Sequence, residues 1–165
     1  MKEKSKTKFI TQAALIAALY VVLTFIANAF GLASYAVQVR FSEALTILPF
    51  FTPSAIPGLF TGCIIANTLT GCMTLDIVFG STATLLGAVL TYTLRKYQWL
   101  APLPPILSNT LIVPFVLRYV YEIPGSIPYF ALTVGAGEVI SCGVLGMLLL
   151  HAIKRNRALY SYFSE

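Results

Sequence analysis

The sequence ALTILPFFTPSAIPGLFTGCIIANTLTGCMTL, residues 44–75, contains three prolines and no charged side chain. A helix that crosses a membrane needs about 20 apolar residues, at about 1.5 Å of rise per residue. This stretch is therefore too long for one crossing and short for two. Pro49, Pro53 and Pro57 each lack a backbone N–H group and disfavour helical backbone at the preceding residue. The prolines therefore favour two short helices joined by a turn near residues 52–54.

The distribution of basic residues indicates that both short helices cross the membrane. If they do, nine of the 11 Lys and Arg residues lie on one side and only Arg40 and Arg118 on the other. A single crossing would split them five against six. Cytoplasmic loops carry an excess of Lys and Arg, so we expect six transmembrane helices with both termini in the cytoplasm. The nine residues are Lys2, Lys4, Lys6, Lys8, Arg95, Lys96, Lys154, Arg155 and Arg157. The expected helices cover residues 9–30, 43–52, 55–72, 77–95, 101–120 and 127–153.

The composition of the chain indicates lipid as its surroundings. Of the 165 residues, 58% are hydrophobic and only 10% are charged, whereas soluble domains carry about 25% charged residues. So few polar side chains could not cover a soluble fold of this size. We therefore expect a single transmembrane domain over residues 1–165, an all-α bundle in a bacterial plasma membrane. The net charge of +5 is concentrated at the two ends, which argues against a nucleic-acid partner.

Motifs of catalysis and of metal binding are absent from the sequence. The chain has no Walker A sequence, no HExxH and no nucleophile elbow, so we do not expect an enzyme or ATP hydrolysis by this chain. Cys63, Cys72 and Cys142 lie in apolar stretches without metal-ligand spacing. We accordingly expect neither a cofactor nor a metal ion.

Glu138 is the polar residue that the membrane makes most costly. It lies about ten residues inside the last predicted helix, where a carboxylate costs about 2.5–3.5 kcal/mol on insertion scales. Such a side chain should face the protein interior and be paired, protonated or bound to a ligand. Glu138 is therefore a candidate for solute binding. The alternative is a buried hydrogen bond to Asn109 or Asn67 that only fixes helix packing.

A second group of polar residues is expected near the outer face of the bilayer. Ser42 and Glu43 also suit an N-terminal helix cap, and Arg118 and Glu122 also suit solvated interfacial charges. The amides of Asn67 and Asn109 can equally join helices by hydrogen bonds worth roughly 0.6–2 kcal/mol. The outer group comprises Gln38, Arg40, Ser42, Glu43, Asn67, Asp76, Arg118 and Glu122.

Small residues on the first helix form two overlapping pairs, Ala13 with Ala17 and Ala14 with Ala18. Small side chains let helix backbones approach closely in lipid, where no hydrophobic force drives helices together. Because this helix begins in the cytoplasmic leaflet, the pairs are candidates for contact with a partner subunit.

The chain resembles the QueT family over nearly its whole length. The first-loop signature and the motif around Asp76 are the specific ones, whereas the loop at residues 119–125 matches poorly. The matching stretches are VQVRFSEALT (37–46), LPFF (48–51), AIPGLF (55–60), GCIIAN (62–67), LDIVFGS (75–81), ATLL (83–86), WLAPLPP (99–105), Asn109, TVG (133–135) and Gly137-Glu138.

QueT-like proteins resemble the substrate-binding S components of energy-coupling factor (ECF) transporters, which have six helices. The resemblance implies a queuosine precursor as the ligand, such as preQ1 (7-aminomethyl-7-deazaguanine). It also implies a transmembrane coupling subunit and two cytoplasmic ATPase subunits as partners. The alanine pairs of the first helix resemble the small-residue motif by which S components dock on the coupling subunit.

A deazaguanine ligand assigns roles to the candidate residues. Its N–H donors and its aminomethyl cation require carboxylates, its carbonyl oxygen requires an amide donor, and its ring requires an aromatic face. The sequence does not decide which carboxylate meets which end, or between preQ1, preQ0 and queuine. The candidates are Glu138, Asp76 and Glu43 for the carboxylates, Asn67, Asn109 or Gln38 for the amide, and Phe41, Phe79 or Tyr129 for stacking.

Two other functions stay open on the sequence. An S component for another vitamin, such as riboflavin or thiamine, would keep the fold and the docking surface and change only the pocket. A stand-alone membrane protein with a structural or assembly role would make Glu138 a packing residue.

Overall fold

The computed structural model describes residues 2–31 and 39–163, with side chains from Lys6 onward. Every regular element within these ranges is a helix, which confirms the predicted all-α class. Four helical runs are long and apolar enough to cross a membrane, as a multi-pass membrane protein requires. They are Lys6–Ala29, Thr74–Thr93, Gln98–Tyr119 and Ile127–Arg155.

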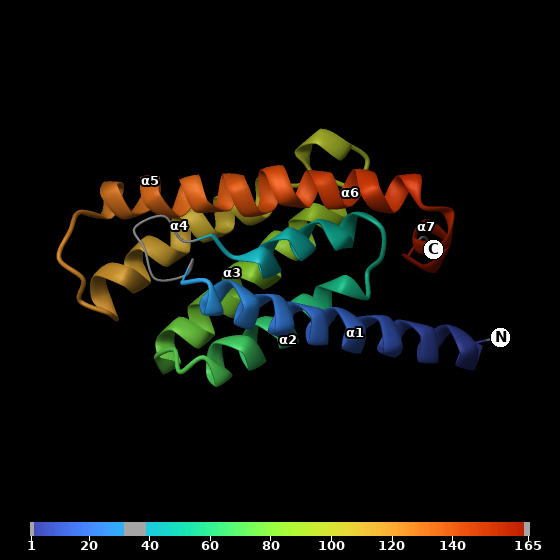
Figure 1. Ribbon diagram of the computed structural model, residues 1–165, viewed down its shortest axis with the longest axis horizontal. Helices are drawn as coiled ribbons and strands as arrows, with labels where there is room; N and C mark the ends of the chain where they lie inside the picture. The colour runs from blue at the N-terminus through green and yellow to red at the C-terminus, as the bar shows by residue number, and fades with distance from the viewer. Residues whose placement is uncertain (1, 32–38, 164–165) are drawn as a thin grey trace.

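Two shorter apolar helices, η1 (Phe41–Phe50) and α2 (Ala55–Leu69), occupy the proline-rich stretch. The chain turns between them at residues 51–54, where the prolines predicted a turn. In Figure 1 the two helices run in opposite directions along the bundle, with the turn at the end that also holds both termini. Crossing of the membrane by these two helices remains a prediction, since each is shorter than 18 residues.

The η1 segment is a 3-10 helix of 10 residues. Its rise of about 2.0 Å per residue carries it about 20 Å, whereas ten residues of α-helix would reach only about 15 Å. Seven of its side chains are buried, and it contacts α1 (Lys2–Ala29), α3 (Thr74–Thr93) and α6 (Gly146–Arg155). The tighter helix therefore carries a short segment through the middle of the bundle.

The expected single helix over residues 127–153 has three parts. The α-helix α5 (Ile127–Glu138) passes into a π-helical segment, η3 (Val139–Leu145), before α6 begins. Such π segments are rare and occur often at functional sites. Here the π segment begins directly after Glu138 and contacts η1. The interruption was not predicted, because its residues are as apolar as those of the α-helices around it.

The contact between α1 and α2 relies on glycine. A methyl group added to Gly58 would lie 2.7 Å from the Ala13 carbonyl oxygen, and one added to Gly62 would lie 3.0 Å from Ala17 Cα. The two helices therefore approach backbone to backbone, as small residues permit in membranes. The other extensive helix contacts join α2 to α3, α3 to α4 (Leu103–Tyr119) and α4 to α5.

A last helix, α7 (Arg157–Phe163), which the sequence did not predict, packs at the end of the bundle near both termini (Figure 1). Asn156 Oδ1 accepts hydrogen bonds from the Ala158 and Leu159 amides. Buried Gln12 donates to the Tyr162 carbonyl oxygen and accepts from Thr52 and Ser54, which ties α7, α1 and the 51–54 turn together. The termini share one end of the bundle, and their cytoplasmic orientation remains a prediction.

Candidate functional site

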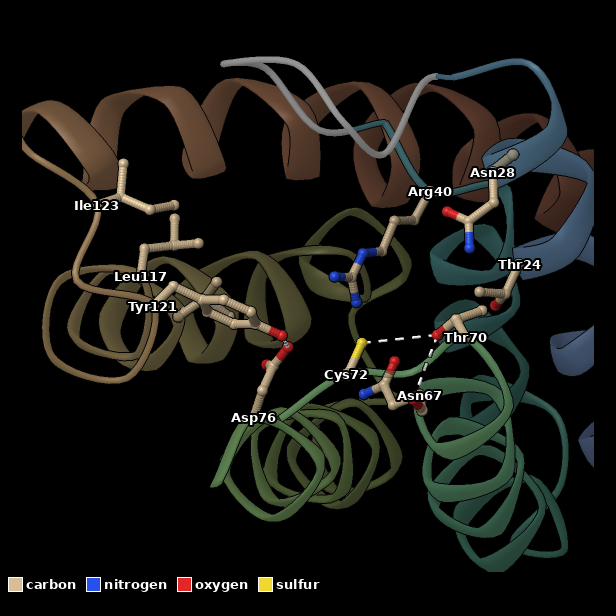
Figure 2. Close-up of a pocket in the computed structure, with 12 residues that line it drawn as sticks. Thr24, Asn28, Arg40, Asn67, Thr70, Cys72, Asp76, Leu117, Tyr121 and Ile123 are labelled. Carbon is tan, nitrogen blue, oxygen red and sulfur yellow. Dashed lines mark hydrogen bonds between the residues drawn. The ribbon is translucent and has the colours of Figure 1, made fainter. Parts of the chain in front are cut away.

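A polar cavity of about 360 Å³, shown in Figure 2, opens near the end of the bundle opposite the termini. The end of α1, the end of α2, the start of α3 and the end of α4 with its following loop supply its walls. Its lining residues are Thr24, Ala27, Asn28, Arg40, Asn67, Thr70, Cys72, Asp76, Val113, Leu117, Tyr121 and Ile123.

Asp76 and Tyr121 meet on one side of this outer cavity (Figure 2). The Tyr121 phenol donates a hydrogen bond of 2.7 Å to Asp76 Oδ2 and accepts one of 3.3 Å from the Met73 amide. Burial raises the pKa of the Tyr121 phenol, and its hydrogen bond to Asp76 raises that pKa further. The phenol is therefore protonated at neutral pH and joins the loop after α4 to the start of α3.

Arg40 reaches into the cavity from the segment that precedes η1 (Figure 2). Its backbone N–H donates a hydrogen bond of 3.1 Å to Ser141 Oγ in the π segment. On the α2 side of the cavity lie Asn67, Thr70 and Cys72. The outer cavity therefore combines one guanidinium group, one carboxylate and two amides around a space of ligand size.

A second, deeper polar pocket adjoins the outer cavity and has only about 20 Å³ of space. Arg40, Asp76 and Val113 line both spaces, so the deep pocket lies directly beside the larger one. Its lining residues are Arg40, Glu43, Cys63, Asp76, Gly80, Thr84, Asn109, Val113, Val134 and Glu138.

Two buried carboxylates dominate the deep pocket. Glu43 is 2% exposed, and its Oε1 accepts a hydrogen bond from the Tyr20 phenol, while Oε2 has no hydrogen-bond partner within the described residues. Glu138 Oε1 accepts from Asn109 Nδ2 at 3.0 Å, and its Oε2 accepts from the Cys142 thiol at 3.1 Å. Buried polar atoms are nearly always satisfied, so the free Glu43 Oε2 requires an explanation.

The same carboxylates belong to a cluster with the residue types of a cation site. Oxygen atoms of Glu43 and Glu138 and the Cys142 sulfur lie within 4.8 Å of one another. The guanidinium group of Arg40 lines this pocket, and its fixed positive charge opposes a divalent metal ion there.

The QueT transporter family model matches residues 10–155 of the chain. The chain belongs to the QueT transporter family. This confirms the predicted family and supports the prediction that the chain is not an enzyme. A relative from Lactococcus lactis subsp. cremoris (strain MG1363), named queuosine precursor transporter QueT, is 34% identical over 102 residues. That match covers 59% of this chain and spans 60% of the relative's length. No solved structure matches the chain.

The structure brings together most of the polar residues that the QueT motifs singled out. Arg40, Asn67 and Asp76 line the outer cavity, while Glu43, Asn109 and Glu138 line the deep pocket with Arg40 and Asp76. The hydrogen bond considered between Asn109 and Glu138 is present. Gln38 lies outside the described residues.

Other residues that the sequence singled out as candidates lie outside the two polar spaces. Phe79 and Tyr129 are about half exposed, and neither these two nor Phe41 lines the outer cavity or the deep pocket. Phe79 instead borders an apolar groove between α3 and α4. Arg118 donates to the Ile123 carbonyl oxygen, and Glu122 is exposed.

Glu43 lies in the first turn of η1, near the positive end of the helix dipole as the sequence suggested, but η1 has no side-chain capping bond. Arg40 is the N-cap residue of η1, and it makes no side-chain capping bond. The Ser42 hydroxyl accepts a hydrogen bond of 2.9 Å from Thr24, and Glu43 pairs with Tyr20. Both side chains therefore face α1 because each finds a buried hydroxyl partner there.

Several cavity residues were missed by reasoning from the sequence. Tyr121 is the aromatic side chain of the outer cavity, yet it lies in the loop that matched the QueT pattern poorly. Thr24 and Asn28 on α1 also line the cavity, and Tyr20 contacts Glu43. A polar residue recurring every four positions in an apolar helix, at 20, 24 and 28, is the signal that could have identified this face.

The four alanines that were predicted to contact a partner subunit lie on two different faces of α1. Ala17 is 9% exposed and packs with Ala13 against α2, whereas Ala14 and Ala18 are exposed. The outward pair is therefore available to another membrane helix.

Proposed function

We propose that this chain is the substrate-binding S component of an ECF importer and that it binds a queuosine precursor such as preQ1 from the extracellular side. The observation that carries the proposal is the polar cavity of about 360 Å³ beside the buried Glu43 and Glu138 pair. Ionisable side chains are costly in lipid and mark functional sites by default, which supports a binding role for this pair. The name of the Lactococcus relative supports the same class of ligand.

The lining of the outer cavity suits a deazaguanine ring. Asp76 offers acceptor oxygens for the ring N–H groups, and Asn67 and Arg40 offer donors for its carbonyl oxygen. Tyr121 supplies an aromatic side chain in place of the stacking residues expected from the sequence. Apolar contacts from Val113 and Leu117 complete a site of the mixed character that small-molecule pockets have.

The charge balance of the two spaces favours a cationic ligand. Glu43, Asp76 and Glu138 face a single guanidinium group, that of Arg40, among the described lining residues. Uncompensated buried carboxylates attract positive charge strongly in a medium of low dielectric constant. The aminomethyl group of preQ1 supplies such a charge, whereas an anionic vitamin would be repelled.

In the proposed importer ATP hydrolysis would come from partner subunits, because this sequence has no ATP-binding motif. In the proposed assembly a transmembrane coupling subunit contacts α1 through Ala14 and Ala18, and two cytoplasmic ATPase subunits drive the cycle. The exposure of these two alanines supports that arrangement, since small outward residues permit close helix contact in lipid.

Mass spectrometry of the small molecules released from the purified full chain tests the proposed function. We expect a 7-deazaguanine to be released from the wild-type protein and to be depleted in Asp76→Asn. Release of riboflavin or thiamine instead would assign the S component to another vitamin. Release of no solute, together with no uptake of preQ1 by cells that produce the chain with its partners, would contradict a role in transport.

A further inference from the structure

The two adjoining polar spaces differ greatly in size, and the difference bears on how a ligand lies in the site. The outer cavity has about 360 Å³ and the deep pocket about 20 Å³, and they share Arg40, Asp76 and Val113 as walls. A cavity needs about 10–15 Å³ of such space to hold one water molecule. The deep pocket can therefore take one group of about the size of water or ammonium, and it cannot take a ring.

The carboxylate oxygens of the deep pocket can accept more hydrogen bonds than the described residues donate to them. The Tyr20 phenol occupies Glu43 Oε1, and Asn109 and Cys142 occupy the two oxygens of Glu138. Glu43 Oε2 is buried and has no partner within the described residues. A carboxylate oxygen has two lone pairs, so the pocket can still accept hydrogen bonds from a donor that enters between Glu43 and Glu138.

The charges of the deep pocket call for one more positive group. Glu43, Asp76 and Glu138 line the pocket with three carboxylates, and the guanidinium group of Arg40 balances only one negative charge when all three are ionised. One entering ammonium group would reduce the remaining negative charge and satisfy the free oxygen at the same time. Buried charges are stable only when paired and hydrogen-bonded.

We propose that the deep pocket is a socket for a primary ammonium group and that the ligand binds with its ring in the outer cavity and its aminomethyl group between Glu43 and Glu138. This inference rests on the proposed function and assigns the two ends of the ligand. Asp76 then meets the edge of the ring, because Tyr121 already occupies its Oδ2 and holds it at the side of the larger space.

The orientation makes Glu43 and Glu138 the residues that determine selectivity between an amine and a neutral substituent. The purified full chain is titrated with preQ1 and with preQ0, which carries a neutral nitrile in place of the aminomethyl group. We expect preQ1 to bind at least about tenfold more tightly, since an unpaired buried acceptor is costly. In Glu43→Gln and in Glu138→Gln the preference should fall towards unity, while preQ0 binding, which reports a folded site, persists.

Asp76→Asn serves as the matched control, because it should weaken preQ1 and preQ0 by similar factors and leave their ratio unchanged. A third ligand tests the size of the socket on the wild-type protein alone. The 7-(dimethylaminomethyl) analogue keeps the positive charge but exceeds the space of about 20 Å³, so it should bind at least about tenfold more weakly than preQ1.

Three results would overturn this orientation. The first is equal binding of preQ1 and preQ0 to the wild type. The second is loss of the preference for preQ1 in Asp76→Asn but not in the glutamate variants. The third is an affinity of the wild type for the dimethylated analogue that equals its affinity for preQ1. Failure of the wild type to bind any deazaguanine would instead remove the proposed function and the inference together.

Discussion

Asn109 on α4 donates a hydrogen bond of 3.0 Å from Nδ2 to Oε1 of Glu138 at the end of α5. The bond joins two buried side chains across neighbouring helices and holds the Glu138 carboxylate beside the free oxygen of Glu43. The bond therefore joins the two helices, and in the proposed function it also positions the carboxylate for a ligand.

Replacing Glu138 by Gln should weaken preQ1 binding while the protein stays folded. The Gln amide can still accept the Asn109 bond, but it presents an NH₂ group where a ligand donor needs an acceptor. The expected loss is about 1–3 kcal/mol, which is roughly 5-fold to 150-fold in affinity. Isothermal titration measures it, with Glu122→Gln as the control because Glu122 is exposed outside the site. Equal affinities in both variants would make Glu138 a packing residue.

Alanine at Gly58 should destabilise the protein. Its methyl group would lie 2.7 Å from the backbone oxygen of Ala13, and the backbone has little freedom to move away. Such overpacking typically costs about 1–3 kcal/mol, which thermal unfolding of the purified protein in detergent would detect. The matched control is Gly143→Ala, where the nearest atom lies 3.7 Å from the added group. If both variants unfold at the wild-type temperature, the close α1–α2 contact is wrong.

Bulky residues at Ala14 and Ala18 should weaken assembly with the coupling subunit but spare ligand binding. Both positions are exposed on α1, so a tryptophan there separates the two proteins without disturbing the fold. Copurification of the complex is the measurement, and Leu132→Trp provides a lipid-facing control, since Leu132 is 74% exposed on α5. Normal assembly of the alanine variants would place the docking surface elsewhere.

Both termini should lie in the cytoplasm. Reporter fusions at residue 1, at Lys96 and after Glu165 should all report the inside, and a fusion at Asp76 should report the outside, because Lys and Arg favour the cytoplasmic side. An outward C-terminus with an inward N-terminus would mean that η1 and α2 do not both cross the membrane.

The sequence predicted the helices well where hydropathy and proline decide them. The turn at 51–54 and the breaks between the long runs follow from Pro53 and from polar loops, and they lie where expected. The 3-10 form of η1 and the π segment after Glu138 were not predictable. In lipid both faces of a helix are apolar, so periodicity does not show which backbone form a short buried segment adopts.

The sequence predicted the charged residues of the candidate site but not the aromatic residue in its wall. A buried carboxylate such as Glu43 or Glu138 stands out in an apolar sequence because lipid excludes it. An aromatic residue does not, since Phe79 facing lipid and Tyr121 facing the cavity look alike in the sequence. Only the fold shows that Tyr121 reaches Asp76 from a loop 45 positions away.

The most direct measurement of the central claim is the affinity of the purified chain for preQ1, compared with riboflavin and thiamine under the same conditions. The account predicts saturable binding of preQ1 by isothermal titration, at one site per chain, and much weaker binding of both vitamins. A chain that binds riboflavin or thiamine more tightly than preQ1, or that binds none of the three, would contradict it.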